Sequence, residues 1–442
     1  MKEYLNRLLD RIETGEAKIA VVGLGYVGLP LAIAFAERGF QVLGFDTDYH
    51  KLDMLKRGES YLSHIEPEEF KILIAEKRLV PVNSYADLVE CDVFIVCVPT
   101  PLTCNREPDL SAIETAACGL KQCLGPSRLF ILESSTYPGT TRNIFARLLT
   151  AGTARIAGKD VFIAHSPERQ DPGNQKFKTH NVPRVVGGVT PFCLEAAIRL
   201  YKKIIEKVVP VETTDTAEMV KLFENTYRMV NIALVNELKM LCHRLGINVW
   251  SVVEAAATKP FGFQSFKPGP GLGGHCIPID PFYLTWKARE VDMATRFIEL
   301  AGEINSSMPY YVVERLVLAL EGHKKSLRDA SILVLGVAYK ANVNDARESP
   351  AIKILRILTE RNARAIYHDP YIADISFGKD EFLFRMASVP LTSETIANAD
   401  AVLVLTDHTD IDYARIGKLS RLVVDTRNVV TLKNNSTNYF PA

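Results

Sequence analysis

Near its N-terminus the chain reads Lys18-Ile19-Ala20-Val21-Val22, followed directly by Gly23-Leu24-Gly25-Tyr26-Val27-Gly28. The first five residues are mainly apolar and β-branched, which predicts a short buried strand. Residues 29–38 then have helical character, and a second strand over residues 41–45 ends at Asp46. A strand, a glycine-rich turn, a helix and a second strand in this order are typical of a doubly wound α/β domain.

The glycines of this turn indicate a dinucleotide site. Gly23, Gly25 and Gly28 permit a tight turn, the approach of a pyrophosphate to backbone N–H groups, and close packing of helix on strand. Asp46 lies roughly 20 residues beyond the motif, where an acid that binds the ribose is expected. A carboxylate at this position repels a 2′-phosphate, so the motif predicts NAD rather than NADP.

The composition limits the possible partners. The chain has 442 residues with 52 basic and 52 acidic side chains, hence zero net charge. At about 100 to 200 residues per domain, this length predicts two to four domains. Zero net charge provides no general attraction to nucleic acid or to an anionic membrane, and no segment approaches the ~18 apolar residues of a membrane span.

The N-terminus and the cysteines favour a cytoplasmic protein. Residues 1–17 alternate acidic and basic side chains around spaced leucines, which predicts an amphipathic helix packed on the first domain rather than a signal peptide. The eight cysteines form no CxxC pair, which indicates reduced thiols. A zinc site at His275, Cys276 and Asp280 lacks a second paired motif, so we expect no metal.

Later strands of the first domain deliver polar side chains to the same edge of the sheet. Predicted strands over residues 93–98, 129–132 and 161–164 are followed by Thr100, Thr136 and Glu168, respectively. Ligands of open parallel sheets bind outside the carboxyl ends of the strands, so these residues are expected near the cofactor. The alternatives are that the threonines cap helices and that Glu168 and Arg169 form a solvated pair.

A helical region follows. Residues 215–245 contain no Gly or Pro and have helical apolar periodicity, with Lys221 and Asn225 on one face. Further helices are expected over residues 250–256 and 292–320. A lysine in apolar surroundings more often extends its ammonium to solvent than takes part in catalysis.

Between these helices lies a loop of glycines and prolines, Lys267-Pro268-Gly269-Pro270-Gly271-Leu272-Gly273-Gly274-His275-Cys276-Ile277-Pro278-Ile279-Asp280-Pro281. Such a segment fits neither a regular helix nor a regular strand. It is either a surface turn with a buried cysteine or a site.

A hydride acceptor, a thiol and a cation together favour oxidation of a primary alcohol past the aldehyde, because a thiolate traps the aldehyde and a second oxidation gives a thioester. Lys221 is the candidate cation that activates Cys276 and stabilises the oxyanion.

The α/β alternation restarts near the C-terminus. Strands are expected over residues 331–335, 365–368, 401–405 and 422–424, with Pro350 opening a helix. This unit lacks the glycine motif and therefore suits a different nucleotide, whose phosphates Lys340, Arg347 and Arg427 are placed to receive. We thus predict two Rossmann-like doubly wound parallel-sheet domains, residues 1–209 and 323–442, joined by a helical middle domain, residues 210–322.

Six motifs together resemble the UDP-glucose/GDP-mannose dehydrogenase family over nearly the whole chain. They are Gly23 to Gly28, Ser135-Thr136-Tyr137-Pro138-Gly139-Thr140, Ser166-Pro167-Glu168-Arg169, Lys221-Leu222-Phe223-Glu224-Asn225, Gly273-Gly274-His275-Cys276 to Asp280, and Arg347-Glu348-Ser349. The resemblance implies Cys276 as nucleophile, Lys221 at the oxyanion, Asn225 orienting the sugar, Asp280 supporting Cys276 and Lys221, Glu168 assisting thioester hydrolysis, and Thr136 holding a water that relays protons. It also implies NAD contacts at Gly23, Gly25, Tyr26, Val27, Gly28, Asp46, Lys51, Thr100, Thr136 and Arg347, and UDP-sugar contacts at Glu168, Arg169, Lys221, Asn225, Lys267, Gly273, Lys340 and Arg427.

The long form of the Gly/Pro loop is similar to family members that oxidise UDP-N-acetylhexosamines, above all UDP-N-acetylglucosamine, for surface-polysaccharide precursors. The sequence leaves the stereochemistry at C2 open, so UDP-N-acetylmannosamine remains an alternative. A two-electron 3-hydroxyacid dehydrogenase and a non-catalytic nucleotide-sugar sensor are rival readings that do not need Cys276. The UDP-glucose enzymes of the family have an arginine shortly before this loop that reaches the site of a neighbouring subunit. It has no clear counterpart here, where the chain has Lys259-Pro260. A homo-oligomer is expected from the long apolar helix.

Overall fold

The computed structural model describes residues 2–62, 65–103, 105, 107–169, 177, 179–274, 279–377, 384–430 and 438–442. The chain divides into two compact units, Met1–Glu224 with Phe282–Ala294, and Asn225–Pro281 with Thr295–Ala442. Helix α8, Thr214–Leu245, begins in the first unit and continues in the second. The scheme of three domains, residues 1–209, 210–322 and 323–442, stays a prediction.

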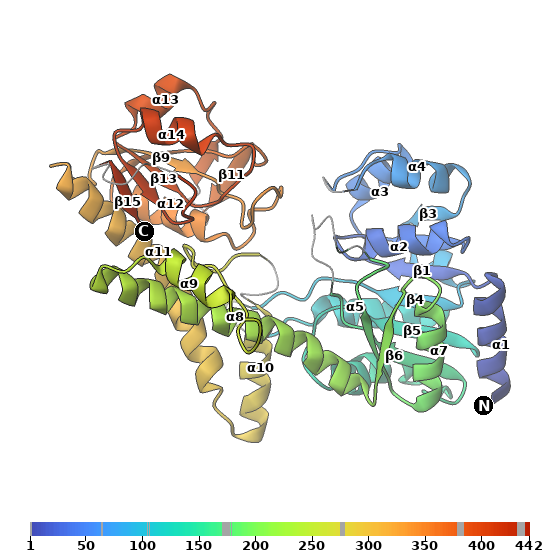
Figure 1. The fold of residues 1–442 in the computed structure, drawn as a ribbon. Coiled ribbons are helices and arrows are strands. Elements are labelled where there is room, and N and C mark those ends of the chain that lie inside the picture. Colours follow the sequence, from blue (N-terminus) through green and yellow to red (C-terminus); the bar gives the residue numbers. More distant parts are fainter. Residues whose placement is uncertain are drawn as a thin grey trace. The chain divides into compact units, whose positions relative to one another are not determined.

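Within the described residues, the first unit is built on an eight-stranded sheet in the order β3-β2-β1-β4-β5-β6-β7-β8 (Figure 1). The strands are β1 Ile19–Val22, β2 Val42–Phe45, β3 Leu79–Val82, β4 Val93–Val96, β5 Arg128–Leu132, β6 Val161–His165, β7 Arg184–Gly188 and β8 Val208–Val211. Strand β1 lies between β2 and β4, so the strand order reverses there, as in a doubly wound sheet. All neighbouring strands are parallel except β6 and β7, which are antiparallel.

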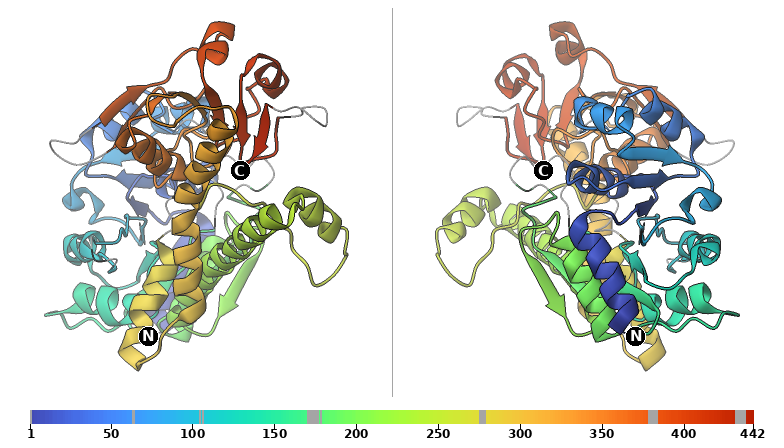
Figure 2. Two further views of the ribbon diagram at one scale, coloured as in Figure 1. Left: turned by 90° about the vertical axis from the view of Figure 1, so that its left-hand side faces the viewer. Right: turned by 90° about the vertical axis from the view of Figure 1, so that its right-hand side faces the viewer.

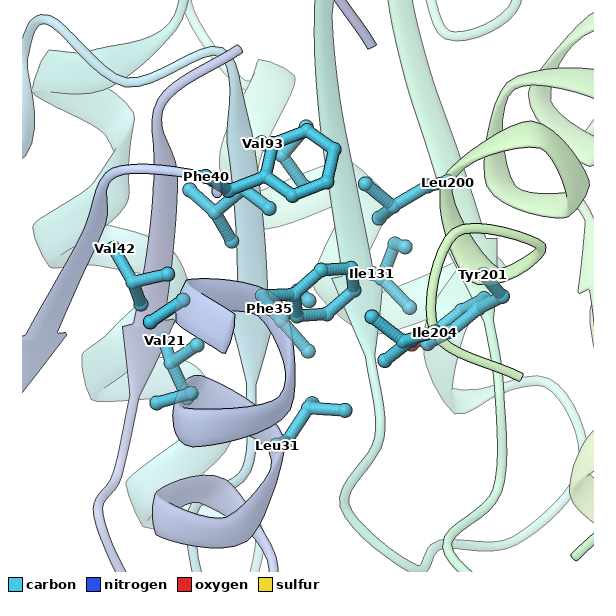
Figure 3. Close-up of a cluster of buried hydrophobic side chains, with 14 of the residues drawn as sticks. Val21, Leu31, Phe35, Phe40, Val42, Val93, Ile131, Leu200, Tyr201 and Ile204 are labelled. Atoms are coloured by element: carbon cyan, nitrogen blue, oxygen red, sulfur yellow. The ribbon is translucent and has the colours of Figure 1, made fainter. Parts of the chain in front are cut away.

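Helices cover this sheet. They are α1 Lys2–Thr14, α2 Gly28–Glu37, α3 Tyr49–Lys56, α4 Glu68–Ala75, η1 Tyr85–Leu88, α5 Ser111–Leu120, η2 Lys121–Cys123, η3 Thr141–Phe145, α6 Ala146–Thr150, α7 Pro191–Tyr201 and η4 Arg289–Val291, with α10 Asp280–Ala288 shared between the units. The predicted N-terminal helix is confirmed: α1 buries Leu5, Leu8 and Ile12 and runs beside α7 (Figure 2). The core beneath α2 and α7 centres on Phe35 (Figure 3), whose ring meets that of Phe40 edge-on at 5.9 Å.

The second unit contains a parallel five-stranded sheet in the order β10-β9-β13-β14-β15, again within the described residues. Its strands are β9 Ser331–Leu335, β10 Arg364–His368, β13 Ala401–Val404, β14 Val423–Asp425 and β15 Tyr439–Pro441, and β11 Asp374–Phe377 pairs with β12 Phe384–Ala387. Its other helices are α9 Val249–Ala257, α11 Arg296–Gly322, α12 Pro350–Glu360, α13 Ser393–Asn398 and α14 Tyr413–Leu419. Pro350 opens α12 as predicted, with Ser349 as the cap. Two Rossmann-like sheets and a helical region confirm the predicted fold class.

One helix begins later than predicted. Asp292 has a left-handed backbone, φ 54°, which ends the preceding turn, so α11 starts at Arg296 and not at residue 292. The sequence also did not predict α10 or β15. In the part of the chain that the structure describes, no helix is long and apolar enough to cross a membrane.

Candidate active site

The glycine turn between β1 and α2 has room only for glycine at two positions. Gly23 has φ +95°, and a Cβ there would lie 2.7 Å from the carbonyl oxygen of Cys97. A Cβ on Gly28 would lie 1.8 Å from the carbonyl oxygen of Gly23. Among the residues that the structure describes, and apart from its two chain neighbours, no heavy atom lies within 4 Å of a Cβ built on Gly25. Gly23 and Gly28 therefore serve packing, whereas Gly25 leaves open the space that a pyrophosphate needs.

The acid at the end of β2 contacts this turn. One oxygen of the buried Asp46 carboxylate accepts from the N–H of Leu24 and the other from the N–H of Asp48, both at 2.9 Å. Lys51 lies 3.6 Å from the same carboxylate. Tyr61, which the sequence did not single out, donates its hydroxyl to the carbonyl of Leu24. The first unit thus brings together Gly23, Gly25, Tyr26, Val27, Gly28, Asp46 and Lys51.

The two predicted threonines are buried at turns beyond β4 and β5, and neither caps the next α-helix. Thr100 donates its hydroxyl to the carbonyl of Ser135 at 2.7 Å, and its own carbonyl accepts from the hydroxyl of Tyr283. Thr136 donates to the hydroxyl of Thr140 at 2.7 Å. Both turns are therefore held by internal hydrogen bonds at the carboxyl ends of neighbouring strands.

Two ion pairs tie the segment after β6 to helix α8. Glu168 lies 3.8 Å from the ammonium of Lys221, and both side chains are about nine-tenths buried, with 11% and 10% exposed. Arg169 instead binds Glu224 at 2.6 Å and donates to the carbonyl of Pro183 at 2.6 Å. Glu168 and Arg169 are therefore not a solvated pair. The structure brings two predicted catalytic groups, Glu168 and Lys221, into contact.

In the second unit, Asn225 and Asp280 are joined. Both are buried, and the Asn225 amide donates to the Asp280 carboxylate at 2.6 Å. Cys276, the predicted nucleophile, lies outside the described residues, as do His275, Ile277 and Pro278. The chemistry expected of Cys276 stays a prediction.

The Gly/Pro loop is held by polar side chains that sequence reasoning did not assign to the site. The N–H of Gly269 donates to Asn236 at 2.9 Å, and its carbonyl accepts from the buried Lys239 at 3.3 Å. Asn236 in turn donates to Asn305 at 3.0 Å. The helical spacing of Asn236 from Asn225 was the only sequence signal for this contact.

Further along, the loop packs on the second sheet's loops. A Cβ on Gly273 would lie 2.8 Å from the side chain of Tyr339, and the N–H of Gly274 donates to the carbonyl of Arg347 at 3.3 Å. The Arg347 guanidinium donates three hydrogen bonds to the Asp345 carboxylate, the shortest at 2.6 Å. A Cβ on Gly269 would lie 3.0 Å from the guanidinium of Arg427. The unit thus gathers Gly273, Arg347 and Arg427 around the loop, while Lys340 follows Tyr339 in the chain and Lys267 is exposed.

In the second sheet too, an acidic residue follows a strand, but protein groups bind both oxygens of its carboxylate. One oxygen of Asp369, after β10, lies 3.1 Å from Nε2 of the fully buried His408 and accepts from the N–H groups of Val337 and Ala338. Its other oxygen accepts from the N–H groups of Tyr371 and Ile372. Asp369 stands where Asp46 stands in the first sheet, but with a histidine against it. Among the described residues, no group of three or more His, Cys, Asp or Glu side chains is arranged to hold a metal ion.

The chain matches three domains of one family. Residues 17–205 match the NAD binding domain of the UDP-glucose/GDP-mannose dehydrogenase family, residues 215–307 its central domain, and residues 333–432 its UDP binding domain. The chain belongs to the UDP-glucose/GDP-mannose dehydrogenase family. The resemblance predicted from the motifs is confirmed, and so is the use of NAD, for which the glycine turn and Asp46 provide a fitting site.

Relatives in this family have named substrates. A UDP-N-acetyl-D-mannosamine dehydrogenase of Pyrococcus horikoshii is 37% identical, over 93% of this chain and 96% of that protein. An NDP-N-acetyl-D-galactosaminuronic acid dehydrogenase of Ralstonia nicotianae is 34% identical, over 96% of this chain and 99% of that protein. The solved UDP-D-ManNAc dehydrogenase structure from Pyrococcus horikoshii has a TM-score of 0.86 at 34% identity, covering 96% of this chain and 98% of that one. This protein is therefore an NAD-dependent nucleotide-sugar dehydrogenase of the family.

Proposed function

We propose that the protein oxidises the C6 alcohol of a UDP-N-acetylhexosamine to the uronic acid. The supporting observation is the buried contact at 3.8 Å between Glu168, in the segment that matches the NAD binding domain, and Lys221, in the segment that matches the central domain. A carboxylate and an ammonium in such surroundings suit proton transfer and oxyanion stabilisation. The balanced reaction consumes one alcohol, one water and two NAD⁺, and releases one carboxylate, two NADH and three protons.

Each residue has one proposed task. NAD, when bound, accepts the hydride in both oxidations. The Cys276 thiolate adds to the aldehyde, Lys221 stabilises the oxyanion so formed, and Glu168 takes a proton from the water that cleaves the thioester. Asn225, held by Asp280, orients the sugar, and Thr136 holds a water that receives the first proton.

The loop sequence and the named relatives favour different sugars for this protein. The form of the Gly/Pro loop favours UDP-N-acetylglucosamine, whereas several relatives are named for UDP-N-acetyl-D-mannosamine. Both sugars are 2-acetamido hexoses that differ only at C2. We propose UDP-N-acetylmannosamine as the first substrate to test and UDP-N-acetylglucosamine as the second. A role in surface-polysaccharide precursor synthesis, a cytoplasmic location and a homo-oligomeric state stay predictions.

The test is the ratio of NADH formed to UDP-sugar consumed, measured with purified protein and a panel of UDP-sugars. We expect a ratio of two and an acid product. A ratio of one would support the two-electron alternative and contradict the proposal. The Cys276→Ala variant should lose turnover, and full turnover by this variant would show that Cys276 is not the nucleophile.

A further inference from the structure

Helix α8 buries a carboxylate to which the proposed reaction assigns no task. Glu218 lies three residues before Lys221 and is fully buried. It accepts from the N–H of Gly139 at 2.6 Å, the N–H of Thr141 at 2.7 Å and the hydroxyl of Thr141 at 2.6 Å. Burying a carboxylate is costly unless it is hydrogen-bonded. All three of these bonds come from one short piece of chain, which we call the threonine turn, residues 136–141.

The threonine turn also carries a residue of the proposed site. Thr136 donates to Thr140 at 2.7 Å, and Thr140 donates to the carbonyl of Tyr137 at 2.8 Å. Gly139 has φ +97°, a conformation that favours glycine. The position of the Thr136 hydroxyl therefore depends on the backbone that Glu218 binds.

The same contact reaches strand β6. The Thr141 hydroxyl lies 3.2 Å from Nδ1 of His165, three residues before Glu168. Because this hydroxyl gives its proton to Glu218, His165 must be the donor through Nδ1–H. Its Nε2 is buried without a hydrogen-bond partner among the described residues. Glu218 thereby connects the turn that carries Thr136 with the strand that delivers Glu168.

The charge of Glu218 is adjustable near neutral pH. Burial raises its pKa to about 7, although the bonds from Thr141 and Gly139 act in the opposite direction. The packed elements carry these other titratable or charged groups: Tyr137 in the threonine turn, Asp215 and Lys221 on α8, Arg142 on η3, and His165 and Glu168 at β6. Asp215 binds Arg142 at 3.0 Å, Lys221 faces Glu168 at 3.8 Å, and burial lowers the pKa of His165 to about 3.

We propose that Glu218 is a positioning residue that holds Thr136 in register with Lys221 by binding the threonine turn to helix α8. The inference rests on the proposed function, because it takes Thr136 and Lys221 as members of the site. Glu218 touches neither substrate nor cofactor in this role. Its effect on the reaction passes through the backbone of Gly139 and Thr141.

The kinetic test uses Glu218→Gln, which keeps the shape but turns an N–H₂ group toward one of the three donors. We expect kcat to fall about 10- to 100-fold, as misplacements near 1 Å do, with the KM for the UDP-sugar changed less than threefold. The wild type should also lose kcat as pH falls through 7, and the variant should lack this step. Thr141→Val should reproduce the loss and Thr141→Ser should not. Glu237→Gln, which changes an exposed carboxylate on the same helix, is the control and should stay within twofold.

A second readout does not depend on turnover. Tyr137, in the threonine turn, lies 4.8 Å from the ring of Trp286. In a Trp250→Phe background, Trp286 is the single tryptophan. We expect Glu218→Gln to increase acrylamide quenching of Trp286, with Glu237→Gln unchanged.

The outcomes are distinct. A lower kcat with altered quenching supports the proposal. Unchanged kcat and quenching overturn it, and a loss confined to thermal stability, with kcat per NADH-binding site unchanged, also overturns it. If the wild type turns over no UDP-sugar, the proposed function fails, while the quenching of Trp286 still decides whether Glu218 holds the turn.

Discussion

Side chains that are remote in sequence meet in the candidate site of this protein. Glu168 and Lys221 meet at 3.8 Å, and Asn225 and Asp280 meet at 2.6 Å. Lys221 and Asn225 both lie on helix α8, and their partners come from the segment after β6 and from the first residue of α10. The identity of each residue followed from its motif, but no local pattern specifies which carboxylate faces which cation.

Glu168→Gln should separate oxidation from hydrolysis. If Glu168 assists the water, its amide leaves the two oxidations largely intact and slows thioester cleavage by roughly 10² to 10⁴-fold. A rapid-mixing experiment should then show a burst of two NADH per active site followed by slow turnover. Glu195→Gln, an exposed carboxylate on α7, should behave as wild type. A variant that shows no burst and normal turnover would remove Glu168 from the reaction.

His165 should make stability depend on pH. Burial lowers its pKa to about 3, whereas an unfolded chain has about 6.5, so the unfolded state binds more protons between these values. The contribution of His165 to the free energy of unfolding is therefore fully present above pH 6.5. It falls as the pH decreases, by about 2 kcal/mol between pH 6.5 and 5. The Tm advantage of the wild type over His165→Gln should shrink over this range. His50→Gln, an exposed histidine, should run parallel to wild type, and a constant difference for His165→Gln would contradict the assignment.

At the scale of elements, periodicity predicted helix α8 almost to the residue, because its apolar side chains repeat over a run without Gly or Pro. The sequence pattern predicted the glycine turn and the strands on either side of it equally well. Strand β7 ends in two glycines and β8 contains Pro210, so neither has the signature of a strand. Their pairing, and the antiparallel step between β6 and β7, depend on contacts far apart in the chain.

The Gly/Pro loop should depend on helix α8. Asn236→Ala leaves the N–H of Gly269 and the side-chain oxygen of Asn305 without their partner, at a cost of about 1–3 kcal/mol for each buried group. We expect a lower Tm and weaker binding of UDP, measured by calorimetry. Asn231→Ala, which removes a less buried asparagine of the same helix, is the control. Equal effects of the two variants would show that Asn236 has no special role in holding the loop.

At the scale of the whole molecule, each nucleotide should have its own set of determinants. Asp46→Asn alters the acid of the first sheet and should weaken NADH binding by about tenfold or more, because a bond to a charged group contributes about 1.5–3 kcal/mol. Arg427→Met should weaken UDP binding by a similar factor. Titration of both variants with both ligands makes each the control of the other. Loss of UDP binding in Asp46→Asn, or of NADH binding in Arg427→Met, would contradict separate determinants.

The two sheets share one architecture but match domains for different nucleotides. Asp369 explains why the second sheet could not simply take the nucleotide of the first. In the first sheet the strand-end acid holds its turn through Leu24 and Asp48. In the second, the corresponding carboxylate is already committed to His408, Val337 and Ala338 on one oxygen. Grafting the glycine motif into the second sheet would therefore not suffice to engineer a second NAD site. His408 would have to be replaced as well, so converting this unit to dinucleotide binding requires at least two coordinated changes.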